Sequence, residues 1–123
     1  MQEFEAIIIG TGQAGPSLAA RFAAEGKKTA VVERKLFGGT CVNNGCTPTK
    51  ALVASARTAY VSGRAADFGV TIGGDITVDM KAVKARKDKI VSQSTNGVEK
   101  WLRNTKNLAL FKGHARFERA NTI

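Results

Sequence analysis

A glycine-rich turn near the N-terminus constrains the fold of this chain more than any other feature. Gly10, Gly12 and Gly15 directly follow the apolar, β-branched run 4–9, which reads as a buried strand. From residue 15 to about residue 25 the apolar side chains recur at helical spacing, so we expect a helix to begin at the third glycine. A strand, a glycine turn and a helix in this order are typical of dinucleotide-binding units.

The residues that follow complete such a unit. Gly26 is placed to end the helix, and the apolar run 29–32 predicts a second buried strand. Glu33 comes next, at the spacing of about 20 residues from the glycine turn that is expected of a ribose-binding acid. The sequence therefore predicts an α/β fold with a Rossmann-like unit and a parallel sheet.

Each residue type in this unit has a chemical reason. Gly10 and Gly12 let the main chain turn and approach a pyrophosphate, and Gly15 lets the helix lie close to the strand. Ala14 precedes the helix, whose first amides and positive dipole end attract phosphate. The Glu33 carboxylate can accept hydrogen bonds from a ribose and repels a 2′-phosphate, which disfavours an NADP-type ligand. NAD and FAD both fit the unit.

The only two cysteines, Cys41 and Cys46, follow in a glycine-rich run. Pro48 stands where a helix can begin, so we expect both thiols at a helix N-terminus, where the dipole favours a thiolate. In a regular helix their Cα atoms would rise about 7.5 Å, beyond the separation of about 7 Å that a disulfide tolerates. A disulfide needs a break in the helix, for which 43–45, Asn-Asn-Gly, is suited. A local disulfide and two free cysteines both remain open.

The stretch 39–50, Gly-Thr-Cys-Val-Asn-Asn-Gly-Cys-Thr-Pro-Thr-Lys, closely resembles the redox-active signature of the class I pyridine nucleotide-disulfide oxidoreductases. These are FAD enzymes that include dihydrolipoamide dehydrogenase, glutathione reductase and mercuric reductase. The resemblance extends over all 123 residues and implies that residues 1–123 are the N-terminal part of an FAD-binding domain. It implies a Rossmann-like but incomplete domain, with two long helices after the cysteines and with the NAD(P)H-binding and dimerisation domains absent.

The resemblance also implies a mechanism. In this family NAD(P)H reduces the flavin, which passes electrons to a disulfide, and the resulting dithiol reduces the substrate, or the sequence runs in reverse. Cys41 resembles the interchange thiol that meets the substrate, and Cys46 resembles the thiol that lies against the flavin. The other cofactor-lining positions that the resemblance implies are Gly39, Thr40, Lys50 and Ala115.

The substrate implied is a small disulfide or thiol, or a metal ion, and the parent enzyme is expected to be a cytoplasmic homodimer. Asn44, Thr47 and Thr49 depart from the residues usual in the family, so the subfamily stays open. The chain has one glycine fingerprint, so we expect no NAD(P)H site in it and no turnover by this chain alone. The alternative is a non-catalytic thiol redox or dinucleotide-sensing module.

The net charge of +9 raises the question of a nucleic-acid partner. The cations are dispersed from Arg21 to Arg119 rather than clustered on one motif, so none is expected. No stretch approaches the roughly 20 apolar residues of a membrane span. Zinc is not expected either, because the only histidine, His114, is far from the thiols and two thiols do not fill a tetrahedral site.

Beyond the cysteines the pattern predicts two long helices and a third strand. One helix is expected from 49 to about 66 with an apolar stripe, and the other from a cap at Thr77 or Asp79 to about Arg103 with Trp101 facing inward. A strand is expected at 108–111, a tight turn at 113–115 and a further extended segment from 116, with the chain ending in mid-strand.

Overall fold

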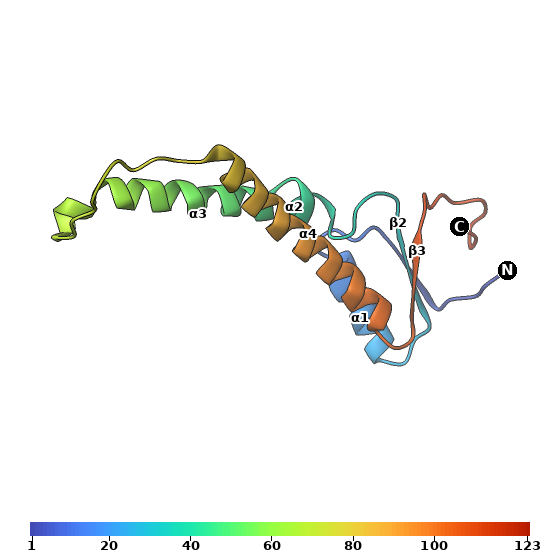
Figure 1. Cartoon of the computed structure of the whole chain (residues 1–123). Helices are drawn as coiled ribbons and strands as arrows, with labels where there is room; N and C mark the ends of the chain where they lie inside the picture. The colour runs from blue at the N-terminus through green and yellow to red at the C-terminus, as the bar shows by residue number, and fades with distance from the viewer.

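The computed structural model describes residues 1–123 and has the predicted α/β fold. Three parallel strands form one sheet in the order β1-β2-β3 (Figure 1). The strands are β1 (Ala6–Ile9), β2 (Thr29–Glu33) and β3 (Leu108–Lys112). Because all three run in the same direction, their carboxyl ends meet at one edge of the sheet, where Glu33 pairs with Lys112.

Helix α1 (Gly15–Ala24) connects β1 to β2 and confirms the predicted βαβ unit. Pro16 stands in its first turn, where a missing amide costs nothing. Gly26 ends the helix region with a φ of 84°, a left-handed conformation that other residues adopt only with strain.

The cysteines lie on two helices, α2 (Gly39–Asn43) and α3 (Cys46–Gly63). The prediction that both thiols stand at the N-terminus of one helix is therefore wrong for Cys41, which lies inside the short α2. It holds for Cys46, the first residue of α3, which begins before Pro48. The predicted break is confirmed, because Asn44 and Gly45 interrupt the helical dihedrals between α2 and α3.

The predicted second long helix is α4 (Met80–Asn104), and it follows the short 3-10 helix η1 (Ala65–Phe68). Its N-cap is Asp79, whose Oδ1 accepts hydrogen bonds from the amides of Lys81 (2.8 Å) and Ala82 (3.1 Å). In Figure 1 α3 and the start of α4 extend away from the sheet as a long arm, with η1 at its tip. The end of α4 returns to pack beside α1 and β3.

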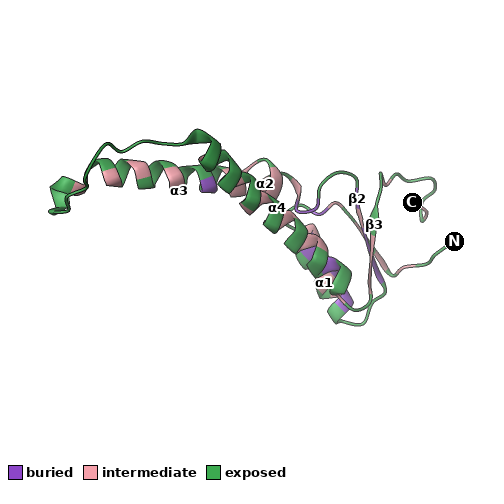
Figure 2. Cartoon of the chain, viewed as in Figure 1, coloured by how far each residue is buried: buried purple, intermediate pink, exposed green.

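One face of the sheet carries the core. Ala19 of α1, Val31 of β2 and Leu102 of α4 are completely buried against one another. Figure 2 shows buried residues where α1 and the end of α4 meet the sheet, and further ones in the loops beside the glycine turn and on α3. The opposite face is open, because Ile7 and Ile9 remain 40% and 53% exposed. The βαβ unit is therefore held by a core on one side only.

Two expectations about the later part of the chain are wrong, those for Trp101 and for the extended segment from residue 116. The apolar stripe of α3 is itself exposed at Val53 and Tyr60, whereas the small residues Ala51 and Ser55 face α4, where Arg86 donates to the carbonyl of Ala51 (2.9 Å). Trp101 is 46% exposed, because the next residue on α4, Leu102, is the one that packs into the core. Residues 116–123 form no long strand but a turn, closed by an antiparallel bridge between Arg119 and Thr122.

No helix of the structure combines the length and the apolar character needed to cross a lipid bilayer.

Candidate functional site

The glycine turn lies between β1 and α1 with the geometry that its residue types predicted. Gly10 has a φ of 96°, and its amide donates to the carbonyl of Val32 (2.7 Å), which ties the turn to β2. A Cβ atom on Gly15 would lie 2.2 Å from the carbonyl oxygen of Gly10. Only a glycine at position 15 therefore lets α1 begin this close to the strand.

Two positions of the turn leave room for a ligand. A Cβ atom on Gly10 or on Gly12 would meet no atom within 4 Å. Gly12 and Ala14 are exposed, and the N-terminus of α1 follows them directly. Free space, an exposed main chain and the positive end of a helix dipole meet at this point, which is the combination that suits a phosphate.

Glu33 is 8% exposed, and both of its carboxylate oxygens accept hydrogen bonds. Its Oε2 accepts hydrogen bonds from the amide (2.9 Å) and the hydroxyl (2.7 Å) of Thr11, and its Oε1 accepts one from the amide of Lys35 (2.8 Å).

These hydrogen bonds decide the charge of Glu33. Burial alone raises the pKa of this carboxyl, but the hydrogen bonds from Lys35 and Thr11, with a smaller one from the amide of Arg34, outweigh burial and lower the pKa below its ordinary value. Glu33 is therefore ionised at neutral pH and acts only as an acceptor.

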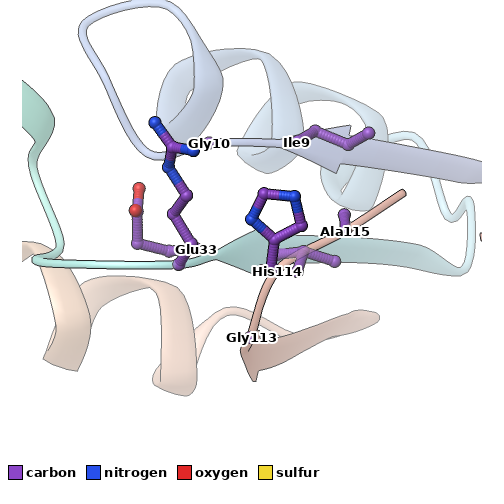
Figure 3. Close-up of a pocket in the computed structure, with 8 residues that line it drawn as sticks. Ile9, Gly10, Glu33, Gly113, His114 and Ala115 are labelled. Carbon is purple, nitrogen blue, oxygen red and sulfur yellow. The ribbon is translucent and has the colours of Figure 1, made fainter.

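A cavity of about 200 Å³ opens at the carboxyl edge of the sheet. Its lining combines the ends of β1 and β2 with the segment that follows β3 (Figure 3). The lining residues are Ile9, Gly10, Val32, Glu33, Arg34, Gly113, His114 and Ala115. The fold thus brings together three of the predicted cofactor residues that are far apart in sequence, namely Gly10, Glu33 and Ala115.

Cys41 and Cys46 form a disulfide, with their Cα atoms 4.8 Å apart. The turn between α2 and α3 makes this short distance possible, and it depends on Gly45, where a Cβ atom would lie 3.2 Å from the carbonyl oxygen of Thr40 and 3.4 Å from the Cα of Cys41. The side chain of Cys46 is exposed and that of Cys41 is half-buried. A thiol or disulfide reagent can therefore reach the pair.

The segment that carries this disulfide, residues 38–46, is here called the redox segment. It lies directly against the glycine turn: a Cβ atom on Gly39 would be 2.8 Å from the Cα of Gly12. The amide of Gly38 donates to the hydroxyl of Thr11 (3.1 Å). The disulfide and the nucleotide-type site are therefore parts of one continuous structure.

Asn43, at the end of α2, holds the redox segment from the other side. Its Nδ2 donates to the carbonyls of Phe37 and Gly39 (2.9 Å each), and its Oδ1 accepts from the hydroxyl of Thr95 on α4 (2.7 Å). These bonds fasten the segment to α4.

The other two predicted cofactor residues, Thr40 and Lys50, are exposed on the two helices that carry the cysteines. Thr40 is exposed on α2, and Lys50 is exposed on α3, about one turn after Cys46. Neither lines the cavity beside Glu33.

Two residues that the sequence reasoning did not single out connect the site. Thr11 is completely buried, and Thr95 contacts the redox segment from a helix far along the chain. Thr11 could have been noticed in the sequence, because the turn itself does not need a hydroxyl between the first two glycines and would form equally well with a non-polar residue there. Thr95 has no comparable signal, because only the path of α4 brings it to Asn43.

Fold and site together define a class of protein: a dinucleotide-binding α/β unit that holds a disulfide against its glycine turn. The chain belongs to the pyridine nucleotide-disulphide oxidoreductase family, whose sequence model matches residues 4–123.

Individual relatives agree with this assignment. The chain is 36% identical to a dihydrolipoyl dehydrogenase of Acholeplasma laidlawii over 99% of its own length and 36% of the relative's. It is 40% identical to the Haloferax volcanii dihydrolipoyl dehydrogenase over 97% of its own length and 24% of the relative's. The chain thus spans about a quarter to a third of the length of these curated relatives.

A solved structure gives the same picture. The copper(II) complex of RclA, the HOCl-induced flavoprotein disulfide reductase of Escherichia coli, matches with a TM-score of 0.77 and 31% sequence identity. The match covers 95% of this chain and 23% of RclA. The predicted fold class and family are therefore confirmed.

Proposed function

We propose that residues 1–123 are the FAD-binding, disulfide-bearing segment of a flavoprotein disulfide oxidoreductase. In the complete enzyme, electrons would pass between NAD(P)H, FAD and the Cys41–Cys46 disulfide, and then to a thiol, a disulfide or a metal ion. The observation that carries the proposal is the main-chain contact between Gly12 and Gly39, which joins a nucleotide-type site to a disulfide. The family and the flavoprotein relative RclA support it.

The residues present fit the adenosine and pyrophosphate part of FAD. Gly10 and Gly12 leave open the space that Cβ atoms would fill, beside the N-terminus of α1. The cavity of about 200 Å³ offers the ionised Glu33 to a ribose and the main chain near Ala115 to an adenine. Lys50 would stand near the flavin end, where its charge favours an electron-rich ring.

When bound, FAD supplies a two-electron carrier that exchanges electrons with the disulfide. On the protein side, the Cys41–Cys46 bond accepts two electrons and two protons and becomes a dithiol. Cys46 begins α3, an 18-residue helix whose dipole favours a thiolate at that position. We propose that Cys46 faces the flavin and that Cys41 exchanges with the substrate.

The substrate class and the missing domains are also proposals. The relatives point to a dihydrolipoyl-dehydrogenase-like activity, and a mercuric-reductase-like activity is the alternative within the same family. The NAD(P)H-binding and dimerisation functions would come from polypeptide outside these 123 residues, so we expect the chain by itself to bind FAD or its AMP portion without turnover. The complete enzyme would act as a cytoplasmic homodimer.

Flavin binding and redox cycling test the proposal. The purified chain is titrated with FAD while flavin fluorescence is recorded, and AMP is added as a competitor. We expect saturable binding that AMP reverses and a disulfide that dithiothreitol opens and air re-forms. A chain that cycles its disulfide but binds neither FAD nor AMP would contradict the proposal and favour a thiol redox module.

A chimera tests the enzymatic part. The chain replaces the matching segment of the Haloferax volcanii dihydrolipoyl dehydrogenase, and NAD(P)H-dependent disulfide reduction is measured. We expect turnover in the chimera and its loss in Cys41→Ser and Cys46→Ser. Robust turnover by the 123-residue chain alone would rule out our expectation that it is inactive.

A further inference from the structure

The side chain of Thr11 is the only one that connects the carboxylate of Glu33 to the redox segment. Thr11 is completely buried between the two, although it lies in the glycine turn. Its hydroxyl donates to Oε2 of Glu33 at 2.7 Å and accepts from the amide of Gly38 at 3.1 Å. The function proposed above uses the bond to Glu33 only through the charge of that carboxylate, and it does not use the bond to Gly38.

The direction of both hydrogen bonds is fixed by chemistry. The amide of Gly38 can only donate, so the oxygen of Thr11 must accept from it. Glu33 is ionised and can only accept, so the hydroxyl proton of Thr11 must point to Glu33. A hydroxyl is therefore required at position 11, and an apolar side chain of the same shape would satisfy neither partner.

The amide of Gly38 has no other acceptor. Gly38 is buried and adopts a φ of 93° directly before α2. The next residue, Gly39, contacts the main chain of Gly12. Without the hydroxyl, a buried N–H group would lose its partner, and the start of α2 would be less firmly placed. Cys41 is the third residue of the five-residue α2, so its position relative to Cys46 depends on where α2 begins.

We propose that Thr11 is a positioning residue that fixes the redox segment through the amide of Gly38 and thereby favours the Cys41–Cys46 disulfide. The inference rests on the proposed function, because it takes this disulfide to be redox-active. An ordered α2 lowers the entropy lost when Cys41 reaches Cys46, so loosening it shifts the thiol–disulfide equilibrium towards the dithiol.

A glutathione redox titration of the full chain tests the inference. Two glutathione molecules reduce the protein disulfide to a dithiol and leave as one glutathione disulfide, and the protein thiols are trapped by alkylation and counted by mass. In Thr11→Val we expect the equilibrium constant for the protein disulfide to fall about fivefold, the effect of losing one hydrogen bond. Thr11→Ser, which keeps the hydroxyl, should restore it.

Thr58→Val is the matched control. The hydroxyl of Thr58 donates to the carbonyl of Ala54 (2.9 Å) on the exposed surface of α3, so the same substitution removes a hydrogen bond that does not reach the redox segment. We expect the wild-type equilibrium constant in this variant. An equal shift in Thr58→Val and Thr11→Val, or no shift in either, would overturn the inference.

Amide hydrogen exchange of the wild-type chain covers the case in which Thr11→Val does not fold. The amide of Gly38 should exchange at least about tenfold more slowly than that of Gly74, which lies in an exposed loop. Equal exchange rates would overturn the role of Thr11. A wild-type disulfide that never re-forms contradicts both proposals, whereas a reversible one that is unchanged in Thr11→Val contradicts this inference alone.

Discussion

Gly12 and Gly39 touch through their main chains. A Cβ atom on Gly39 would lie 2.8 Å from the Cα of Gly12 and 3.2 Å from its amide nitrogen, and Gly39 has a φ of 64°. No side chain separates the turn that would bind a dinucleotide from the segment that carries the disulfide. The distance between cofactor site and sulfur pair is therefore set by two glycines.

Gly39→Ala should destabilise the chain by about 3 kcal/mol, because the alanine pays both for a left-handed conformation and for a clash with Gly12. Urea unfolding of the purified variant measures the loss. Gly74→Ala is the control: its φ is 87°, but a Cβ atom there would meet nothing within 4 Å. Gly74→Ala should lower the free energy of unfolding only by the cost of the left-handed conformation, about 1 kcal/mol. Equal losses would show that the contact with Gly12 contributes nothing.

Gly12→Ala should leave the fold intact and weaken nucleotide binding. A Cβ atom on Gly12 meets no atom of the protein within 4 Å, but it would enter the space where a pyrophosphate is expected. We expect an unfolding free energy within about 1 kcal/mol of the wild type and FAD affinity at least about tenfold lower. Flavin fluorescence titration and urea unfolding measure the two quantities.

Gly15→Ala should show the opposite behaviour. Its Cβ atom would lie 2.2 Å from the carbonyl oxygen of Gly10, so α1 must move away from β1. We expect a loss of about 3 kcal/mol or more in unfolding free energy. A Gly15→Ala chain as stable as Gly12→Ala would contradict the close approach of helix and strand.

Glu33→Gln should remove a pH-dependent part of the stability. The folded chain lowers the pKa of Glu33, so the unfolded chain binds more protons between the two pKa values and stability rises with pH there. The wild-type advantage, about 2 kcal/mol, should be complete above the ordinary glutamate pKa of about 4.3. It should vanish as the pH falls through the lowered pKa of the folded chain.

Urea unfolding of both chains across this pH range measures the difference. Glu25→Gln serves as the control, because Glu25 is exposed and pairs only with Arg21 at the surface. Its effect should stay within about 1 kcal/mol. A wild-type advantage that grows towards acid pH would show that folding raises the pKa of Glu33 rather than lowering it.

Asn43→Asp should shift the Cys41–Cys46 pair towards the dithiol. The substitution keeps the shape but replaces the two donors that bind the carbonyls of Phe37 and Gly39 by an acceptor, which those carbonyls repel. We expect at least about a fivefold fall in the equilibrium constant of the disulfide. Asn44→Asp places the same charge on the exposed neighbour and should change the constant far less. A similar shift in both would assign the effect to charge.

The local elements could be predicted because their signals lie within a few residues. The β-branched run before Gly10, the helical spacing after Gly15 and the cap at Asp79 each specify an element by short-range sterics and hydrogen bonds. The apolar pattern alone did not decide which helix face is buried. Val53 and Trp101 look like core residues in the sequence, yet both are exposed because small side chains and Leu102 make the contacts.

The sequence by itself determined the βαβ unit, the acid at the end of β2 and the break that lets two cysteines approach. These depend on backbone conformations that glycine, proline and β-branched residues impose locally. Only the tertiary structure decided that Gly39 lies on Gly12, that Thr11 bonds Gly38 and that Thr95 reaches Asn43. Such contacts join residues far apart along the chain, and they follow from how the helices and the sheet pack rather than from any local preference.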